Sequence, residues 1–226
     1  MKKTVCLLSA SVMLCALALS SHAFLDDFTD GNLDGWKVQA ENWKVEKGEV
    51  KFSAGGNCGA SLYYEDGAEW TDYTFEVDMK LANLSDFPGG IRVRMNPKTG
   101  ESYFTWVYPA QKIIISYVAI AWDCNANKGQ AARDVWQPPK VGEWGKLKMV
   151  VTGEVIESWW NDKKMLSIKD GSWKKGTIAL MTFNQDVFFD NVRVSGKGIP
   201  LSQGEAVEPE GKVTTTWGKL KTSHIW

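Results

Sequence analysis

The sequence predicts an all-β fold, a two-sheet antiparallel sandwich of the jelly-roll type. Short segments that alternate apolar and polar residues recur along the chain, with turn residues between them. No long stretch has the apolar spacing of an amphipathic helix. The 226 residues are enough for one sizeable all-β domain. Many short strands separated by turns are typical of sandwiches and jelly rolls.

The N-terminus has the pattern of a secretory signal peptide. Lys2 and Lys3 precede an apolar run over residues 5–19, and Ser21-His22-Ala23 forms a small-x-small cleavage site. The run is too short to span a bilayer. We expect cleavage after Ala23, release to the periplasm or the extracellular space, and no membrane insertion of the mature chain.

The predicted strands follow one another from residue 42 to residue 194. They comprise a hairpin over 42–54 with Lys47-Gly48 at its tip, strands at 73–81, 90–95, 101–108 and 112–120, three strands within 146–168, and closing strands at 176–183 and 186–194. Residues 123–144, which include Pro138-Pro139, are predicted to form a long loop. We therefore expect a domain over 24–196 and a linker-like tail over 197–226.

Charge and histidine content exclude several function classes. The net charge is −1 without a basic stripe, which argues against a nucleic-acid partner. The two histidines are His22, in the predicted signal peptide, and His224, near the C-terminus. Histidine-based catalysis and a histidine zinc site are therefore excluded from the predicted domain.

Cysteine content predicts one disulfide. Two of the four cysteines lie in the predicted signal peptide, which leaves Cys58 and Cys124. A single pair in an exported chain favours a disulfide bond. The alternative is two free, buried thiols.

Four segments in a fixed order carry a family resemblance: DDFTDGNLDGW, NWKVEKGEVKF, GEWGKLKMVVTGEVIESWWNDKKML and GTIALMTFNQDVFFDNVRV. Over about residues 25–195 the chain resembles the concanavalin A-like lectin/glucanase superfamily, nearest to its LamG-like and 3-keto-disaccharide-hydrolase-like domains. The resemblance implies a jelly roll whose concave sheet holds carbohydrate.

The strand predicted at 73–81 can be compared with the catalytic strand of the glucanases in this superfamily. Retaining glucanases of the superfamily present Glu-x-Asp-x-Glu on one face, and Glu76 and Asp78 match its first two positions. Lys80 stands at the third position, whereas retaining hydrolysis needs two carboxyl groups about 5–5.5 Å apart. A glucanase mechanism is therefore not expected.

Side-chain parity predicts a shared binding face. Glu76 and Asp78 alternate with apolar residues, as do Arg92 and Arg94 in the next strand, and Tyr103 stands on the strand after that. We predict that these five residues lie together on the concave sheet and contact a sugar. The alternative is a solvated face on which the arginines pair with the acids.

Twelve tryptophans provide further candidates for sugar contact. Sugars present C–H faces to aromatic rings, and Trp122 and Trp136 flank the predicted long loop. We predict that these two indoles contact ligand. The alternative is that they are core residues, because indoles bury large areas.

Asp190 raises the question of a metal. In VFFDNVRVSG it shares parity with Phe188 and Val192, so it is expected to face the core, where a lone carboxylate is costly. The resemblance implies that the first and last strands lie side by side with structural calcium, for which Asp27, Asp30 and Asp190 are the predicted ligands. The alternative is that backbone N–H groups hold Asp190 without metal.

The N-terminal segment also fits an EF-hand consensus. Its matching residues are Asp30, Asn32, Asp34, Gly35 and Glu41. The flanks are strand-like rather than helical, and Lys37 replaces the usual aliphatic residue. An ordinary Asp-Gly turn is the alternative that we expect.

Taken together, the sequence predicts a secreted carbohydrate-binding protein without catalysis of its own. The first alternative is an enzyme of the 3-keto-disaccharide hydrolase type that cleaves oxidised glycosides by elimination, with Glu76, Asp78 or an arginine as its base or electrophile. The second alternative is a structural or adhesion domain at a surface.

Overall fold

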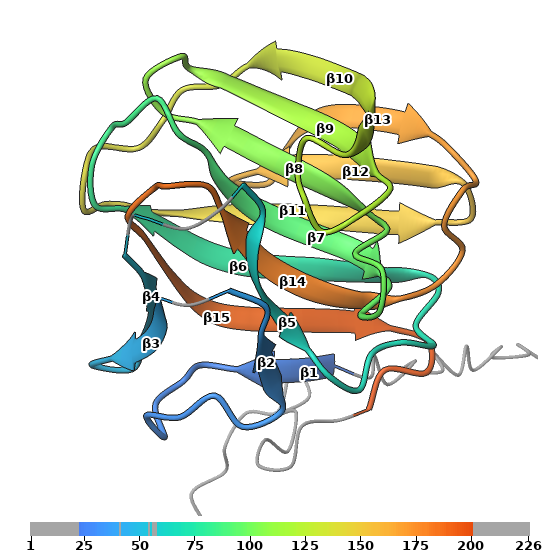
Figure 1. The fold of residues 1–226 in the computed structure, drawn as a ribbon, viewed down its shortest axis with the longest axis horizontal. Coiled ribbons are helices and arrows are strands. Elements are labelled where there is room, and N and C mark those ends of the chain that lie inside the picture. The colour runs from blue at the N-terminus through green and yellow to red at the C-terminus, as the bar shows by residue number, and fades with distance from the viewer. Residues whose placement is uncertain (1–22, 41, 54, 56–57, 201–226) are drawn as a thin grey trace, which may run out of the picture.

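The protein is a sandwich of two antiparallel sheets (Figure 1). A computed structural model describes residues 23–40, 42–53, 55 and 58–200. Within these residues every regular element is a strand, and no helix is long and apolar enough to cross a membrane. The predicted all-β jelly-roll class is confirmed.

The eight-stranded sheet has the order β13-β12-β11-β6-β15-β4-β3, and β1 pairs with β15. Its strands are β1 (Ala23–Asp26), β3 (Trp43–Glu46), β4 (Glu49–Phe52), β6 (Tyr73–Leu81), β11 (Trp144–Thr152), β12 (Val155–Trp160), β13 (Lys163–Lys169) and β15 (Val187–Gly196).

The seven-stranded sheet has the order β10-β9-β8-β7-β14-β5-β2. Its strands are β2 (Trp36–Val38), β5 (Ala60–Tyr64), β7 (Gly89–Met95), β8 (Ser102–Tyr108), β9 (Ile113–Ala119), β10 (Asn127–Val135) and β14 (Thr177–Thr182).

The core fills the space between the two sheets, and period-two alternation builds it. Phe75 and Val77 of β6 point inward and are fully buried, as are Ile91 and Val93 of β7 in the other sheet. Burying one such side chain contributes about 1.5–3 kcal/mol. The expected apolar rows of both strands are thus confirmed.

Three buried hydroxyls tie the sheets together inside this apolar core. The Thr105 Oγ1 of β8 lies 2.9 Å from the Ser116 Oγ of β9 and 2.6 Å from the Ser158 Oγ of β12, and the two serine oxygens are 3.1 Å apart. A hydroxyl both donates and accepts, so the triangle satisfies all three groups without water.

One predicted loop contains a strand. Residues 123–144 were expected to lack regular structure, but they include β10, the edge strand that pairs with β9 (Figure 1). The prediction is wrong because most side chains of β10 are exposed on both sides of the strand. Its sequence NKGQAARDV therefore lacks the apolar alternation of a half-buried strand.

Asp190 does not face the core. The pairing of β15 with β6 shifts between Asp190 and Arg193, and Asn191 has a φ of 50°. This β-bulge reverses the parity, so Phe188 and Asp190 lie on the outer face whereas Val192 is fully buried. The expected core-facing carboxylate is therefore wrong. The expected neighbourhood of the first and last strands is confirmed, because β1 pairs with β15.

The N-terminal acidic segment forms turns. The Asn32 N–H donates to the Asp30 Oδ1 at 3.1 Å, the Asp34 N–H donates to the Asn32 Oδ1 at 2.7 Å, and Gly35 has a φ of 80°. These contacts are the Asp-Gly turn alternative rather than a helix-flanked loop. Glu41, most of the predicted signal peptide and the tail from residue 201 lie outside the described residues.

Candidate functional site

The five residues predicted to share one face lie in two different sheets. Glu76 and Asp78 belong to β6 of the eight-stranded sheet, whereas Arg92, Arg94 and Tyr103 belong to β7 and β8 of the seven-stranded sheet. The predicted grouping is wrong. Parity fixes which residues of one strand share a face, but it does not say which sheet the next strand joins.

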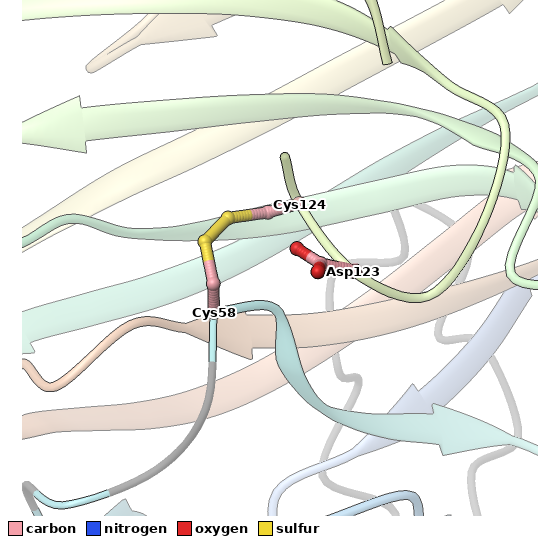
Figure 2. A group of neighbouring side chains, drawn as sticks. All are labelled: Cys58, Asp123 and Cys124. Atoms are coloured by element: carbon pink, nitrogen blue, oxygen red, sulfur yellow. A yellow bond between two sulfur atoms is a disulfide. The ribbon is translucent and has the colours of Figure 1, made fainter. Parts of the chain in front are cut away.

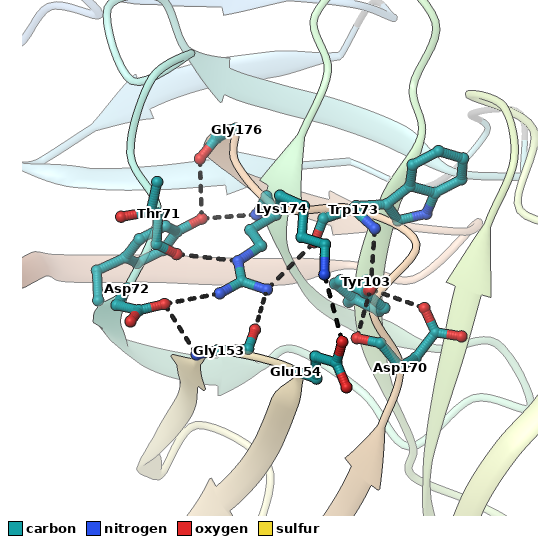
Figure 3. Close-up of polar contacts among 11 residues, drawn as sticks. Thr71, Asp72, Tyr103, Gly153, Glu154, Asp170, Trp173, Lys174 and Gly176 are labelled. Carbon is teal, nitrogen blue, oxygen red and sulfur yellow. Dashed lines mark hydrogen bonds and ion pairs between the residues drawn. The ribbon is translucent and has the colours of Figure 1, made fainter.

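Arg94 is a buried structural clamp, and Figure 3 labels its four partners, Thr71, Asp72, Gly153 and Trp173. Its guanidinium donates to the carbonyl oxygens of Thr71 at 2.9 Å, Gly153 at 2.8 Å and Trp173 at 3.1 Å. It also pairs with the Asp72 carboxylate at 2.9 Å. These contacts join three chain segments. The expected pairing of this arginine with the acids of β6 is therefore wrong.

Tyr103 points into the core side of the same region (Figure 3). Its hydroxyl lies 2.8 Å from the Asp170 Oδ1 and accepts the Trp173 N–H at 3.0 Å. Burial raises the pKa of Tyr103 to about 12, so the hydroxyl stays protonated. Because its side chain is fully buried, it does not offer a sugar-contacting surface.

Arg92 lies on the outer side of the seven-stranded sheet and is also fully buried. Its Nη1 donates to the Gly100 carbonyl at 3.1 Å and to the Ser102 Oγ at 3.2 Å, and its Nη2 donates to the Trp122 carbonyl at 2.8 Å. Burial lowers its pKa, and the charge of Asp123 partly opposes this shift. The guanidinium therefore holds the loop that follows β9.

Aromatic side chains cover the outer side of β8 and β9. Tyr103 and Val107 of β8 belong to the inter-sheet core, while Phe104 and Trp106 belong to a second apolar cluster on the opposite side of the strand. We name the aromatic platform by its residues: Tyr63, Phe104, Trp106, Tyr108, Tyr117 and Trp122. Phe104 and Trp106 are buried within it, and the other four are partly exposed.

The rings of the aromatic platform form two contacting groups that Arg92 links. Tyr117 stacks on Phe104 with centroids 4.9 Å apart, and Trp122 lies 5.5 Å from Tyr63. The Arg92 guanidinium bridges the two pairs, 5.3 Å from the Phe104 ring and 5.9 Å from the Trp122 ring. Cation–π contacts of this kind fix the orientation of both rings.

Two tyrosine hydroxyls meet at one end of the aromatic platform. Burial raises the pKa of Tyr108 above its usual value, and the hydrogen bond with the neighbouring Tyr117 hydroxyl raises it further. The Tyr108 phenol is therefore neutral at physiological pH. Neutral hydroxyls both donate and accept hydrogen bonds, as sugar hydroxyls do.

The predicted disulfide is confirmed, and it anchors the loop that carries Trp122 (Figure 2). Cys58, just before β5, is bonded to Cys124, 66 residues further along the chain. Close approach of the two segments needs Gly59, because a Cβ there would lie 2.6 Å from the Trp122 carbonyl oxygen. Asp123 lies beside the sulfurs, but bonded sulfurs are not thiolate metal ligands.

The two predicted ligand-contacting tryptophans have different surroundings. Trp122 is partly exposed on the aromatic platform, as a ligand contact requires. Trp136 is 1% exposed and packs edge-on against Trp160 at 5.0 Å, so it is a core residue. It follows the exposed strand β10, and the sequence gives no sign that the chain turns inward at that point.

The outer face of the eight-stranded sheet is charged and internally paired. Glu76 lies 3.7 Å from the Lys148 ammonium, and the Lys80 ammonium lies 2.6 Å from the Glu49 carboxylate. Lys80 therefore neutralises a neighbouring carboxylate where the glucanase motif would place a third acid.

The calcium ligands predicted from the sequence are only partly brought together. Burial raises the pKa of Asp190, and the charges of Asp78, Glu49 and Asp27 raise it further, so Asp27 and Asp190 are electrostatic neighbours. Burial raises the pKa of Asp26, and the charges of Asp30 and Asp27 raise it further, whereas Asp30 is not among the charges that act on Asp190. Among the described residues, these carboxylates do not form a group of three ligand atoms within 4.8 Å. Calcium binding remains a prediction.

Most of the aromatic platform was missed from the sequence, although a signal was present. Both parities of SYFTWVY in β8 are apolar or aromatic. A strand with two apolar faces is covered on both sides. The second covered side is the platform, with the disulfide-anchored loop above it.

The fold resembles carbohydrate-active proteins of known structure. The family 66 carbohydrate-binding module of Bacillus subtilis is 16% identical, with a TM-score of 0.59 over 72% of this chain and 96% of that chain. A Bacillus licheniformis β-glucanase is 10% identical, with a TM-score of 0.61 over 79% of this chain and all (100%) of that one. A Bacillus subtilis protein of unknown function with a galectin-like fold is 9% identical, with a TM-score of 0.58 over 76% of this chain and 94% of that one. At these identities the likeness shows the fold.

Sequence comparison identifies the family. No curated protein sequence matches the chain. The profile of the 3-keto-alpha-glucoside-1,2-lyase-like domain matches residues 24–195, which include nearly all of the sandwich. The resemblance drawn from the four sequence segments is confirmed, and the chain belongs to the 3-keto-alpha-glucoside-1,2-lyase-like domain family.

Proposed function

We propose that this protein is a secreted carbohydrate-binding domain and that its ligand lies on the aromatic platform of the seven-stranded sheet. The observation that carries the proposal is the composition of that outer face. An outer sheet face in water is normally polar, whereas this one presents four partly exposed aromatic side chains around a buried guanidinium.

The chemistry of the platform suits a saccharide. Pyranose rings offer apolar C–H faces to the rings of Tyr63, Tyr117 and Trp122, and their hydroxyls can bond the phenols. The rings are held by stacking, by the Arg92 clamp and by the disulfide. A preorganised face loses little conformational entropy when it binds.

Arg92 supports binding by positioning rather than by contact. Its four donor contacts go to protein oxygens, and its Nε is buried without a partner among the described residues. We therefore assign it the role of holding Trp122 in place.

The test is a glycan array probed with the mature protein and with Trp122→Ala and Tyr117→Ala variants. We expect wild-type binding to a restricted set of glycans and at least about tenfold weaker binding in both variants. Trp159→Ala is the matched control, because this indole lies on the opposite sheet between Lys148 and Lys164. Equal binding by all four proteins, or none by wild type, would reject the proposal.

An enzymatic alternative is favoured by the family match. Asp123 is an exposed carboxylate close enough to Arg92 to affect its pKa. In a 3-keto-glucoside the C2 proton is acidified by the ketone. A carboxylate base can remove that proton while the C1–O bond breaks and the leaving oxygen takes up a proton. Release of product from a 3-keto-glucoside by wild type but not by Asp123→Asn would establish this activity.

A further inference from the structure

The outer face of the eight-stranded sheet has a depression of its own. Its volume is about 380 Å³, enough for one or two sugar rings, and it lies where β6 and β11 meet the turn between β12 and β13. The lining residues are Asp78, Trp144, Gly145, Lys146, Asn161 and Asp162. None of them belongs to the aromatic platform.

Trp144 forms an exposed aromatic wall of this depression. Its side chain is 39% exposed, and among the exposed large apolar residues of the described chain it is the one aromatic residue. The Lys80 ammonium lies 4.3 Å from its ring and is itself held by the Glu49 carboxylate at 2.6 Å. The indole is therefore kept in one orientation while part of it faces water.

Polar groups line the other side of the depression and are fixed by the backbone. Asn161 and Asp162 have φ values of 46° and 63° and form the tight turn between β12 and β13. The Asn161 Oδ1 accepts the Lys146 N–H at 2.8 Å, which leaves its amide N–H₂ as a donor. The Asp78 Oδ2 accepts from Asn191 at 3.0 Å, which leaves its second oxygen as an acceptor.

Charge balance indicates the class of ligand. The Asp162 carboxylate already pairs with the Lys148 ammonium at 3.2 Å, and Asp78 stands opposite Lys146 in the register of β6 and β11. A strongly charged ligand would face groups of its own sign as well as opposite ones. A neutral, polyhydroxylated ring suits an indole wall with mixed donors and acceptors.

We propose that this Trp144 depression is a second saccharide-binding site, which takes one or two neutral sugar rings. It lies on the opposite sheet from the aromatic platform and does not depend on the function proposed for that face. If both sites bind, one molecule can bridge two saccharide chains, and avidity on a polymer would exceed the affinity of either site.

The test compares glycan-array profiles of wild type, Trp144→Ala and Asp162→Ala. We expect both variants to lose, by about tenfold or more, the same subset of signals. Asp162 has an 81% exposed side chain, so its replacement removes no core packing and strains only the turn, where its φ is 63°. The core therefore stays intact even if the tryptophan variant is unstable. Trp159→Ala, on the same face but outside the depression, should keep these signals.

The platform variants separate this inference from the first proposal. Trp122→Ala should retain every signal that Trp144→Ala loses. The second site would be overturned if Asp162→Ala and Trp144→Ala gave the same array profile as wild type. Absence of binding by all three proteins would overturn it as well. If Trp122→Ala loses all array signals and the profile of Trp144→Ala is unchanged, the aromatic platform is the single binding site.

Discussion

The two outer faces of the sandwich differ in where their charged side chains lie. On the eight-stranded sheet, lysines and carboxylates alternate with core residues, and the ion pairs we find there are at least partly exposed. On the seven-stranded sheet, Arg92 is 0% exposed, its donors reach backbone carbonyls, and aromatic rings lie around it. Apart from the Trp144 depression, the first face is a solvated, ion-paired sheet surface, whereas the second is a covered interior with an aromatic rim.

Similar sequence patterns in the two sheets thus have different structural outcomes. FEVDMKL in β6 and GIRVRM in β7 both alternate apolar and charged residues. The charged side chains of β6 reach water. Those of β7 are buried, with Arg92 under the disulfide-anchored loop and Arg94 at the end of the sandwich. An exposed ion pair contributes about 0–1 kcal/mol, whereas an orphaned buried carbonyl costs about 1–3 kcal/mol.

The largest effect on stability is therefore expected for Arg92→Ala. It removes a buried side chain, takes from the Trp122 carbonyl the donor that lies 2.8 Å away, and leaves the Gly100 carbonyl with the Ser102 hydroxyl as its side-chain donor. We expect a loss of about 3 kcal/mol or more in the free energy of unfolding, measured by urea denaturation. Lys164→Ala is the control: this cation is 51% exposed on the other face and should change stability by about 0.5 kcal/mol or less. Equal effects of the two variants would remove the distinction between the faces.

Removal of the disulfide should have the next largest effect. The double variant Cys58→Ser, Cys124→Ser opens a link between positions 66 residues apart. We expect a loss of about 2–4 kcal/mol, because the unfolded chain gains conformational freedom. Glycan binding through Trp122 should weaken as well, because its loop loses an anchor. Thermal melting of wild type with and without a reducing agent checks the first expectation, and unchanged melting would contradict it.

Asp190→Asn should raise the free energy of unfolding slightly, whereas the two preceding changes lower it. Burial and the neighbouring carboxylates raise the folded-state pKa of Asp190 above 3.8, so the folded protein binds this proton more tightly than the unfolded chain does. The free energy of unfolding therefore falls as the pH rises from about the unfolded-state pKa of Asp190 through its raised folded-state pKa. The amide should make the protein more stable at pH 7 by a few tenths of a kcal/mol, discounted for solvent screening, and this gain should vanish below pH ~3.

The same variant tests the predicted calcium site at Asp27, Asp30 and Asp190. If calcium binds there, millimolar calcium should raise the melting temperature of wild type in a concentration-dependent way. Asp190→Asn should lose that response. Identical wild-type melting in chelator and in calcium would contradict the site.

The fold was largely predictable because its signals are local. Alternation in 73–81 and turn residues such as Lys47-Gly48 give strands and hairpins directly, and the order of elements gives the jelly roll. Sheet membership and the bulge at Asn191 were not predictable, because both depend on partners distant in sequence. The exposed strand β10 was missed because it has no apolar face.

The candidate site was predictable only in part. Trp122 and the cysteine pair were identified from loop position and from composition. Arg92 was expected to be an exposed sugar contact, because nothing in GIRVRM indicates that a loop from residues 120–126 covers it. Trp144, a wall of the depression on the other sheet, was not singled out among the twelve tryptophans.

Hydrogen exchange with a bound oligosaccharide shows directly which face of the sandwich binds carbohydrate. A glycan identified on the array is added to wild type, and backbone protection is mapped by mass spectrometry. We expect protection in β8, β9 and the loop around Trp122, with added protection near Trp144 where the second site is also occupied. Protection confined to the eight-stranded sheet would contradict the assignment of the aromatic platform as the carbohydrate-binding face.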